Sequence, residues 1–286
     1  MSEPASTRVR VRAPAKINLT LRILSTRPDG YHDLRTTFQS LALHDTLTFT
    51  ASSGPFAIDC TDPECPTDQQ NLVWRAADAL WREADRRGEP SGVRVQLDKQ
   101  IPLRAGLGGG SSDAAAALRA LAVLWRIRIG ADRLREIART LGADVPFFFE
   151  GGTVLGVDRG DTLFSLVDQS PSWVVLALPD FGIATRDAYQ WWDEDFGEGE
   201  SNAEIGNDLE PSVSARHPAI GRAVKRLARL GASHAAMSGS GSAVFGLFQG
   251  ERKARAAARE ISGRRLDTVV TRTLSRRQYR HFSRPR

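Results

Sequence analysis

A run of glycines followed by two serines is the strongest chemical signal in the sequence. The segment PLRAGLGGGSSDAA (102–115) follows an alternating, strand-like stretch and opens directly into an alanine-rich stretch. Without Cβ atoms, backbone N–H groups can turn inward around an anion, and the first turn of a helix adds further unpaired N–H groups. This predicts a phosphate-binding loop. Taken alone, the glycines could also form a flexible turn with Ser111 and Ser112 as helix caps.

Two charged residues in apolar surroundings are candidates for handling a proton and developing charge. Asp144 lies in LGADVPFFF, where a carboxylate costs desolvation free energy unless a cation or a donor meets it. General bases are tuned in such settings, although a cap after a helix that ends at Gly142 would explain Asp144 equally well. Lys16 interrupts the apolar strand APAKINL, where a lysine either extends to the sheet edge or points into a site.

Two turns carry further polar or aromatic side chains. The turn RPDGYHDL presents Tyr31 beside His32, a pair that can stack on and hydrogen-bond a heterocycle. The segment SGSGS (238–242) lies between two short apolar runs and predicts a tight turn between strands. The sequence has neither GxSxG nor HExxH, which argues against a serine hydrolase and against a histidine-built metal site. The loop at 102–115 also lacks the GK[ST] of a Walker loop and the last glycine of GxGxxG.

The elements that position these residues follow from periodicity. We expect strands with an intervening turn over 9–50, helices over 68–88, from 110 onward, 132–141, 216–231 and 252–265, and strands over 92–102, 173–179, 234–248 (two) and 268–274. Strands and helices mix in both halves, so the fold class is α+β, with domains over 1–160 and 161–286. We expect the acidic stretch 192–204 to be a surface loop or lid, and the tail 276–286 to be a frayed, solvated end.

Composition excludes several classes of protein. The 286 residues are 41% hydrophobic and 26% charged, and no apolar run approaches the roughly 18 residues of a membrane span. Without a secretory h-region, the sequence predicts a cytoplasmic protein that does not engage a membrane. The net charge of +5 is weak support for a polyanionic partner, because only four of the 39 basic residues are lysines and the arginines are dispersed.

Three segments together resemble the motifs of the GHMP small-molecule kinases, which include galactokinase, homoserine kinase and mevalonate kinase. They are APAKINLTLRIL, PLRAGLGGGSSDAAAAL and AAMSGSGSAVF. More narrowly, RPDGYHDL, FQSL, QNLVWRA and LGADVPFF are similar to the branch of this family that acts on a cytidylyl substrate. The likeness is dense from about 13 to 149 and sparse afterwards. It implies a two-domain α+β GHMP kinase fold, with left-handed βαβ units and an ATP and substrate cleft between the domains.

The resemblance also implies a reaction. It is the ATP- and Mg²⁺-dependent phosphorylation of the 2-hydroxyl of a methylerythritol carried on cytidine diphosphate, in non-mevalonate isoprenoid precursor biosynthesis. Asp144 would be the base, and Lys16 would orient it and stabilise charge. This agrees with the needs of phosphoryl transfer, which are positioning and charge neutralisation. We expect a small-molecule substrate with a cytidine diphosphate group, no nucleic-acid partner, and a monomer or weak homodimer.

Carried over by motif, the remaining site residues fall into two groups, and none is assigned to a metal. The residues implied for ATP are Asn71 and Lys99 toward the nucleoside, and Pro102, Leu103, Arg104, Ala105, Gly106, Leu107, Gly108, Gly109, Gly110, Ser111 and Ser112 around the phosphates, which Mg²⁺ would bridge. The residues implied for the substrate are Asn18, Tyr31, His32, Thr185, Tyr189 and Gly239, with the two tyrosines sandwiching the cytosine and His32 reading its edge.

Two features depart from the family pattern. Arg104 stands where a small residue is common, and could attract phosphate or face solvent, of which we favour the latter. The acidic stretch 192–204 has no counterpart in the motifs. The alternatives are another GHMP kinase, of homoserine or mevalonate type, and a non-catalytic relative that binds anions or nucleic acid. Lys16, Asp144 and the uninterrupted glycine loop argue against the second alternative.

Overall fold

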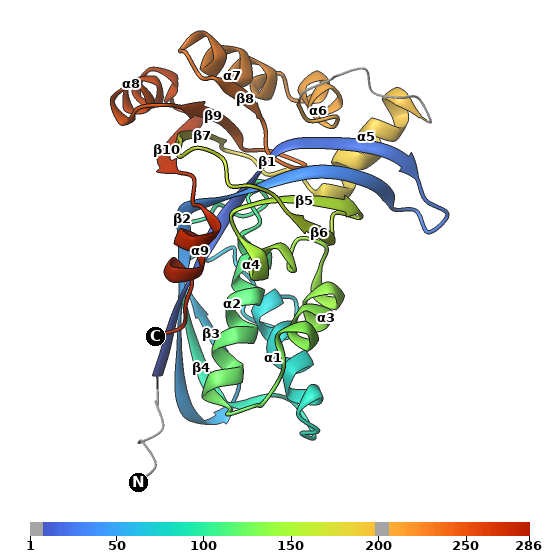
Figure 1. Ribbon diagram of the computed structural model, residues 1–286, viewed down its shortest axis with the longest axis vertical. Helices are drawn as coiled ribbons and strands as arrows, with labels where there is room; N and C mark the ends of the chain where they lie inside the picture. Colours follow the sequence, from blue (N-terminus) through green and yellow to red (C-terminus); the bar gives the residue numbers. More distant parts are fainter. Residues whose placement is uncertain (1–7, 198–205) are drawn as a thin grey trace.

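The computed structural model describes residues 8–197 and 206–286 and contains two β-sheets (Figure 1). The first has the strand order β3-β4-β2-β5-β6, with β1 paired to β2, and the second has the order β10-β7-β9-β8. The strands of the first sheet are β1 (Arg8–Thr26), β2 (His32–Pro55), β3 (Ala57–Cys60), β4 (Ser91–Asp98), β5 (Thr153–Asp158) and β6 (Thr162–Ser165). Those of the second are β7 (Trp173–Pro179), β8 (His234–Met237), β9 (Val244–Phe248) and β10 (Leu266–Arg272).

Helices lie against both sheets. They are α1 (Leu72–Glu83), α2 (Gly109–Leu124), α3 (Ala131–Leu141), α4 (Phe147–Glu150), α5 (Thr185–Phe196), α6 (Glu210–Arg216), α7 (Pro218–Arg229), α8 (Glu251–Ile261) and α9 (Arg276–Phe282). Helices α1, α2 and α3 gather beside the first sheet, whereas α7 and α8 lie beside the second (Figure 1). The mixture of strands and helices confirms the predicted α+β class.

The long antiparallel hairpin of β1 and β2 organises the molecule. Buried and exposed residues alternate along parts of both strands, which is the period of two from which the strands were predicted. The turn RPDGYHDL joins the two strands. Register shifts between Pro14 and Lys16 and between Asn18 and Thr20 bracket the two polar residues of APAKINL. Such irregularities bend a strand locally and change the direction of its side chains.

A parallel crossover supplies the strand that leads into the glycine loop. Strands β3 and β4 pair in parallel, with α1 between them in the chain, which makes a βαβ unit. Helix α1 is capped by Asn71 and ends at Glu83, so it is shorter at both ends than the helix predicted over 68–88. After β4, an inner strand of the first sheet, the chain enters the glycine loop and α2, so the loop follows the carboxyl end of that strand.

The two halves of the chain do not form separate cores. Leu21, Ile23 and Leu34 of the hairpin are buried with the residues of the second sheet and its helices. Strand β6 still belongs to the first sheet, and the second sheet begins at Trp173, beyond the predicted boundary at 160. The division into domains over 1–160 and 161–286 therefore stays a prediction, because segments from both ends of the chain cross it.

The prediction of a frayed tail is wrong. Residues 276–282 form α9, which begins with a capping box between Ser275 and Gln278. Tyr279 is fully buried, and its hydroxyl donates to the carbonyl of Phe148 at 2.6 Å. The backbone of Arg286 then pairs with that of Arg10 in β1. The C-terminus is thus anchored to the first core by packing and hydrogen bonds.

The predicted acidic loop is wrong in its first part. Trp192–Phe196 is the last turn of α5, and the rest of that stretch, 198–204, lies outside the described residues. Within 8–197 and 206–286, no helix combines the length and the hydropathy needed to cross a membrane.

Candidate functional site

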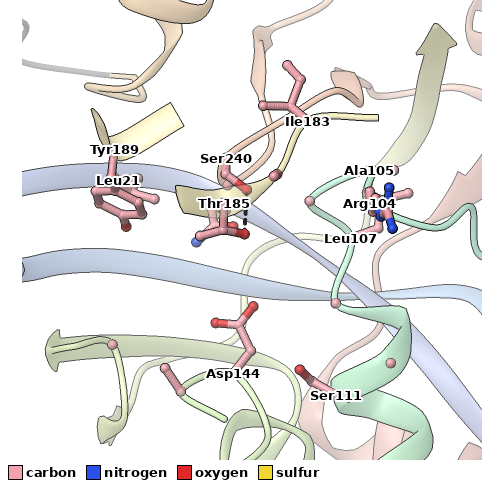
Figure 2. Close-up of a pocket in the computed structure, with 18 of the residues that line it drawn as sticks. Leu21, Arg104, Ala105, Leu107, Ser111, Asp144, Ile183, Thr185, Tyr189 and Ser240 are labelled. Atoms are coloured by element: carbon pink, nitrogen blue, oxygen red, sulfur yellow. Dashed lines mark hydrogen bonds between the residues drawn. The ribbon is translucent and has the colours of Figure 1, made fainter. Parts of the chain in front are cut away.

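A cavity of about 990 Å³ lies between the hairpin, the glycine loop and the beginning of α5 (Figure 2). All of the predicted site residues line it except Asn71 and Ser112. Three segments that are far apart in the sequence therefore meet around one space. Figure 2 shows the carboxylate of Asp144 facing Thr185 and Ser240 across the cavity, with Ser111 at the start of α2 beside them.

Asn71 and Ser112 have structural partners instead. The side chain of Asn71 accepts from the backbone N–H of Val73 and donates to the carbonyl of Pro66, so it caps α1. The hydroxyl of Ser112 donates to the carbonyl of Pro14 at 2.7 Å, and its N–H is bonded to Gly108. Both side chains hold the walls of the cavity in place without lining it.

The glycine loop ends in an uncapped helix. Gly108 is the N-cap of α2 and has φ +71°, the left-handed region that favours glycine. It offers no side chain to the first N–H groups of the helix, so these remain available to an anion. A Cβ at this position would lie 2.9 Å from Cζ of Phe148 and 3.0 Å from Cγ of Lys16. Glycine is therefore required both by the backbone and by the close approach of Lys16.

The Gly108→Ala variant should lose both stability and affinity for a nucleoside triphosphate. The left-handed backbone and the contact with Phe148 should lower the free energy of unfolding by about 1–3 kcal/mol. Displacement of Lys16 and of the first turn of α2 should lower kcat/KM for ATP by about tenfold. Thermal unfolding and initial rates measure the two effects. Gly130→Ala is the control, since Gly130 has φ −74° and open space around it; equal losses in both variants would contradict this reading.

Lys16 points into the cavity rather than to the sheet edge. Its Nζ lies 3.1 Å from Oδ2 of Asp144 and donates to Oδ1 of Asn18 at 2.6 Å. The lysine side chain is 4% exposed and that of Asp144 is 34% exposed, so the ammonium is enclosed while the carboxylate reaches the open space. Asn18 donates in turn to the hydroxyl of Thr36 at 2.7 Å. This chain of hydrogen bonds fixes the lysine beside the carboxylate of Asp144.

Asp144 lies in the turn between α3 and α4, beyond the end of α3 at Leu141. Its carboxylate pairs with Lys16 of β1 rather than with the end of the preceding helix. The position supports the interpretation of Asp144 as a site residue over that of a local cap. A carboxylate held beside an ammonium at the wall of a cavity is suited to accept a proton from a hydroxyl group placed there.

Lys99 forms a buried ion cluster beneath the glycine loop. Its Nζ contacts Asp45 at 2.5 Å and Asp113 at 2.9 Å, and all three side chains are at most 3% exposed. Burial lowers the pKa of Lys99, but the charges of Asp113 and Asp45 outweigh it and the pKa lies above its usual value. Burial raises the pKa of Asp113 to about 7, against the effect of Lys99. Lys99 lines the cavity, but its charge is already paired within the protein.

The raised pKa of Asp113 predicts a pH dependence of stability. A carboxyl that holds its proton more tightly in the folded state stabilises that state below its unfolded pKa, and the stabilisation is lost as pH rises through the folded pKa. Relative to Asp113→Asn, the wild type should therefore lose stability between about pH 4 and pH 7. Thermal melting of both proteins across this range measures the difference. A constant difference would contradict the prediction.

The aromatic residues differ from a simple sandwich. His32 and Tyr189 stack on each other, with ring centroids 4.9 Å apart and an interplanar angle of 23°. Burial, followed by the negative charge of Asp144, raises the pKa of Tyr189, so its hydroxyl stays protonated. Tyr31 is exposed, and the guanidinium of Arg159 lies 5.4 Å from the centre of its ring. Both tyrosines line the cavity, but one face of Tyr189 is already covered by His32.

Comparison with known proteins agrees with this arrangement. Residues 71–152 match the profile of the GHMP kinases N terminal domain, and residues 193–266 match that of the GHMP kinases C terminal domain. A 4-diphosphocytidyl-2-C-methyl-D-erythritol kinase of Geobacter metallireducens is 40% identical over 88% of this chain and 93% of that protein. The chain belongs to the GHMP kinase family. A protein of the same name from Anaeromyxobacter is 42% identical over 88% of this chain and 84% of its own length.

Solved structures extend the comparison to the fold of this GHMP kinase. A crystal structure of 4-(cytidine 5'-diphospho)-2C-methyl-D-erythritol kinase has a TM-score of 0.78 at 35% identity, covering 92% of this chain and 98% of that one. A homoserine kinase from Cytophaga hutchinsonii has a TM-score of 0.71 at 18% identity, covering 100% and 99%. The second likeness concerns the fold alone. The predicted GHMP kinase fold is confirmed, and the relatives do not support the alternative of a non-catalytic binding protein.

Several residues at or beside the cavity of this GHMP kinase escaped the sequence analysis. Asp193 lies in α5 and contacts His32, and Arg159 contacts Tyr31. Asp45 and Asp113 hold Lys99. Asp113 is part of the motif GGSSDAA and could have been noted there, whereas the others have no local signal. Arg104 is exposed, as favoured, yet it also lines the cavity.

Among residues 8–197 and 206–286, no group of three or more histidine, cysteine, aspartate or glutamate side chains is placed to hold a metal ion.

Proposed function

We propose that this GHMP kinase transfers the γ-phosphate of ATP to the 2-hydroxyl of 4-diphosphocytidyl-2-C-methyl-D-erythritol. The observation that carries the proposal is the Lys16–Asp144 pair, 3.1 Å apart, in the cavity that the glycine loop and the aromatic residues share. The names of the relatives supply the substrate, and the cavity of about 990 Å³ has room for a nucleotide-sized ligand.

The reaction needs one proton acceptor and several charge-neutralising groups. The substrate hydroxyl oxygen bonds to the γ-phosphorus of ATP while the bond to the β–γ bridging oxygen breaks, which gives the phosphorylated substrate and ADP. Asp144 accepts the hydroxyl proton, and Lys16 holds the carboxylate in position and offsets negative charge as it develops. The unpaired N–H groups at the start of α2 donate hydrogen bonds to phosphate oxygens during the transfer.

Mg²⁺ fits this chemistry as a partner of the phosphates. It prefers oxygen ligands, keeps several waters, and is bound in kinases by one or two protein oxygens together with substrate phosphates. The hydroxyl of Ser111 and the carboxylate of Asp144 are protein oxygens on the walls beside α2 (Figure 2). When bound, the ion would neutralise charge on the phosphates.

Residues at the other end of the cavity would receive the cytidine. Tyr31 is free to stack on a base with its open face, and His32 would meet the edge of the cytosine. Asn18, Thr185 and Gly239 line the same cavity, and we assign them to the methylerythritol portion of the substrate. Lys99 and Asn71 would act on the nucleoside of ATP through the walls they support rather than through free side chains.

The test is ADP release with ATP, Mg²⁺ and 4-diphosphocytidyl-2-C-methyl-D-erythritol, run beside homoserine, mevalonate and galactose. Turnover confined to the cytidylyl substrate supports the proposal. A preference for one of the other alcohols would keep the kinase and overturn the substrate. No turnover with any of the four, at concentrations well above a typical KM, would overturn the proposed reaction.

A further inference from the structure

Helix α5 surrounds the imidazole of His32 with three side chains. Asp193 Oδ1 lies 2.7 Å from His32 Nε2. Tyr189 stacks on one face of the imidazole, and Trp192 meets it edge-on, with centroids 5.7 Å apart at 88°. His32 begins β2, so these contacts join the hairpin to the helix that follows the second sheet's first strand. The ring is thereby held in one orientation.

One nitrogen of His32 is committed and the other is open. The histidine side chain is 6% exposed, and Nε2 is taken by Asp193. Among the described residues, no side chain or carbonyl is bonded to Nδ1. Some polar side-chain atoms of the described residues are fully enclosed and have no partner, but Nδ1 is not one of them, so it is not sealed inside the protein. His32 lines the cavity. Nδ1 is therefore the atom that a ligand in the cavity can reach.

The carboxylate of Asp193 determines whether Nδ1 of His32 donates or accepts a hydrogen bond. A carboxylate only accepts hydrogen bonds, so Nε2 must carry the hydrogen. In the neutral ring this leaves Nδ1 as an acceptor. An acceptor matches the exocyclic amine of cytosine, whereas uracil presents a carbonyl oxygen at the same position and would face Nδ1 without a hydrogen between them.

We propose that Asp193 is a positioning residue that fixes the Nε2–H tautomer of His32 and thereby makes the cavity select cytosine over uracil. This rests on the proposed function, which places the base of the substrate at His32. A site that binds a polar group discriminates most strongly by leaving a buried partner unpaired when the wrong group binds. Asp193 acts only through His32 and is not placed against the reacting atoms.

The experiment compares steady-state kinetics with the cytidine-linked substrate and its uridine-linked analogue. In Asp193→Ala, KM for the cytidine substrate should rise about tenfold while kcat changes by less than about twofold, because the lost interaction orients the base and not the hydroxyl. The ratio of kcat/KM between cytidine and uridine substrates should fall by a similar factor, about tenfold. Asp193→Asn, which can still accept from Nε2, should restore most of the discrimination.

The matched control is Asp187→Asn, which changes an exposed carboxylate in the first turn of the same helix that is not among the residues lining the cavity. It should leave both KM and the ratio unchanged. Because Asp193 lines the cavity and its side chain is 44% exposed, its removal should not unfold the protein, and thermal melting checks this. An unchanged ratio in Asp193→Ala, or an equal loss in Asp187→Asn, would overturn the proposal.

Nitrogen-15 NMR of the imidazole provides a measurement that needs no turnover. The wild type should show His32 as the neutral Nε2–H tautomer, and Asp193→Ala should show a mixture of tautomers. A doubly protonated His32 at the assay pH would donate from Nδ1, favour uracil and overturn the proposal. If the wild type phosphorylates neither nucleotide substrate, the proposed function fails while the tautomer is still decided by NMR. If it phosphorylates both equally well, only the role of Asp193 fails.

Discussion

Replacing Asp144 with asparagine should lower kcat by about a thousandfold with KM for ATP nearly unchanged. A positioned general base contributes about 10²–10⁴ in rate, and asparagine keeps the size of the side chain while it loses the ability to accept the proton. Asparagine can still face Lys16 at the 3.1 Å distance of the native pair, so binding of ATP should persist. Initial rates of ADP release over a range of both substrates measure kcat and KM separately.

The matched control is Asp267→Asn, which removes one exposed carboxylate from β10, away from the cavity. It should retain full activity, which separates the effect of the site from that of net charge. If Asp144→Asn kept more than about a tenth of wild-type kcat, Asp144 would be an orienting charge and not the base. Lys16→Met should in that case lower kcat more than Asp144→Asn does.

Local pattern predicted the elements well where a segment carries its own signal. The alternation in β1 and β2 and the junction of the glycine loop with α2 both depend on neighbours within a few residues. The strand over 173–179 was predicted at the residues where β7 lies. The glycine loop, Lys16 and Asp144 were also found this way, since each violates the pattern of its own segment.

What failed depends on partners distant in the chain. The tail was taken as frayed because RRQYRHFSRPR is strongly basic, yet Tyr279 finds a core contact at Phe148, 131 residues away. The capping pair Ser275 and Gln278 was a local signal for α9 that could have been used. The contact of His32 with Asp193 spans 161 residues and has no such signal. Contacts between polar side chains that are far apart in the sequence depend on the tertiary fold, so the local sequence pattern does not predict them.

The role of Lys99 also depends on partners that are distant in the chain. The resemblance to the GHMP kinases placed it toward the nucleoside, but Asp45 and Asp113 pair with its ammonium. Asp45 also accepts from the backbone N–H groups of Gln100 and Ile101 at 2.6 and 2.8 Å. The cluster therefore ties the end of β4 and the first turns of α2 to β2. Lys99 supports the loop from beneath.

The Lys99→Met variant should consequently be strongly destabilised. Methionine fills much of the same volume but leaves two carboxylates buried without their cation, and one oxygen of Asp113 already lacks a partner within the described residues. Breaking a buried pair on one side costs about 3–5 kcal/mol. For a chain of this size, the midpoint of thermal unfolding should fall by about 10 °C.

Lys225→Met is the matched control, since it makes the same substitution on the exposed face of α7, and it should leave the midpoint unchanged. The triple variant Lys99→Met, Asp45→Asn, Asp113→Asn should recover part of the loss, because it removes the two buried carboxyl groups together with the lysine. A cofactor-binding lysine would behave differently: Lys99→Met would then melt like the wild type and raise KM for ATP, and the triple variant would recover nothing. The two readings of Lys99 are separated by whether stability or ATP affinity is lost first.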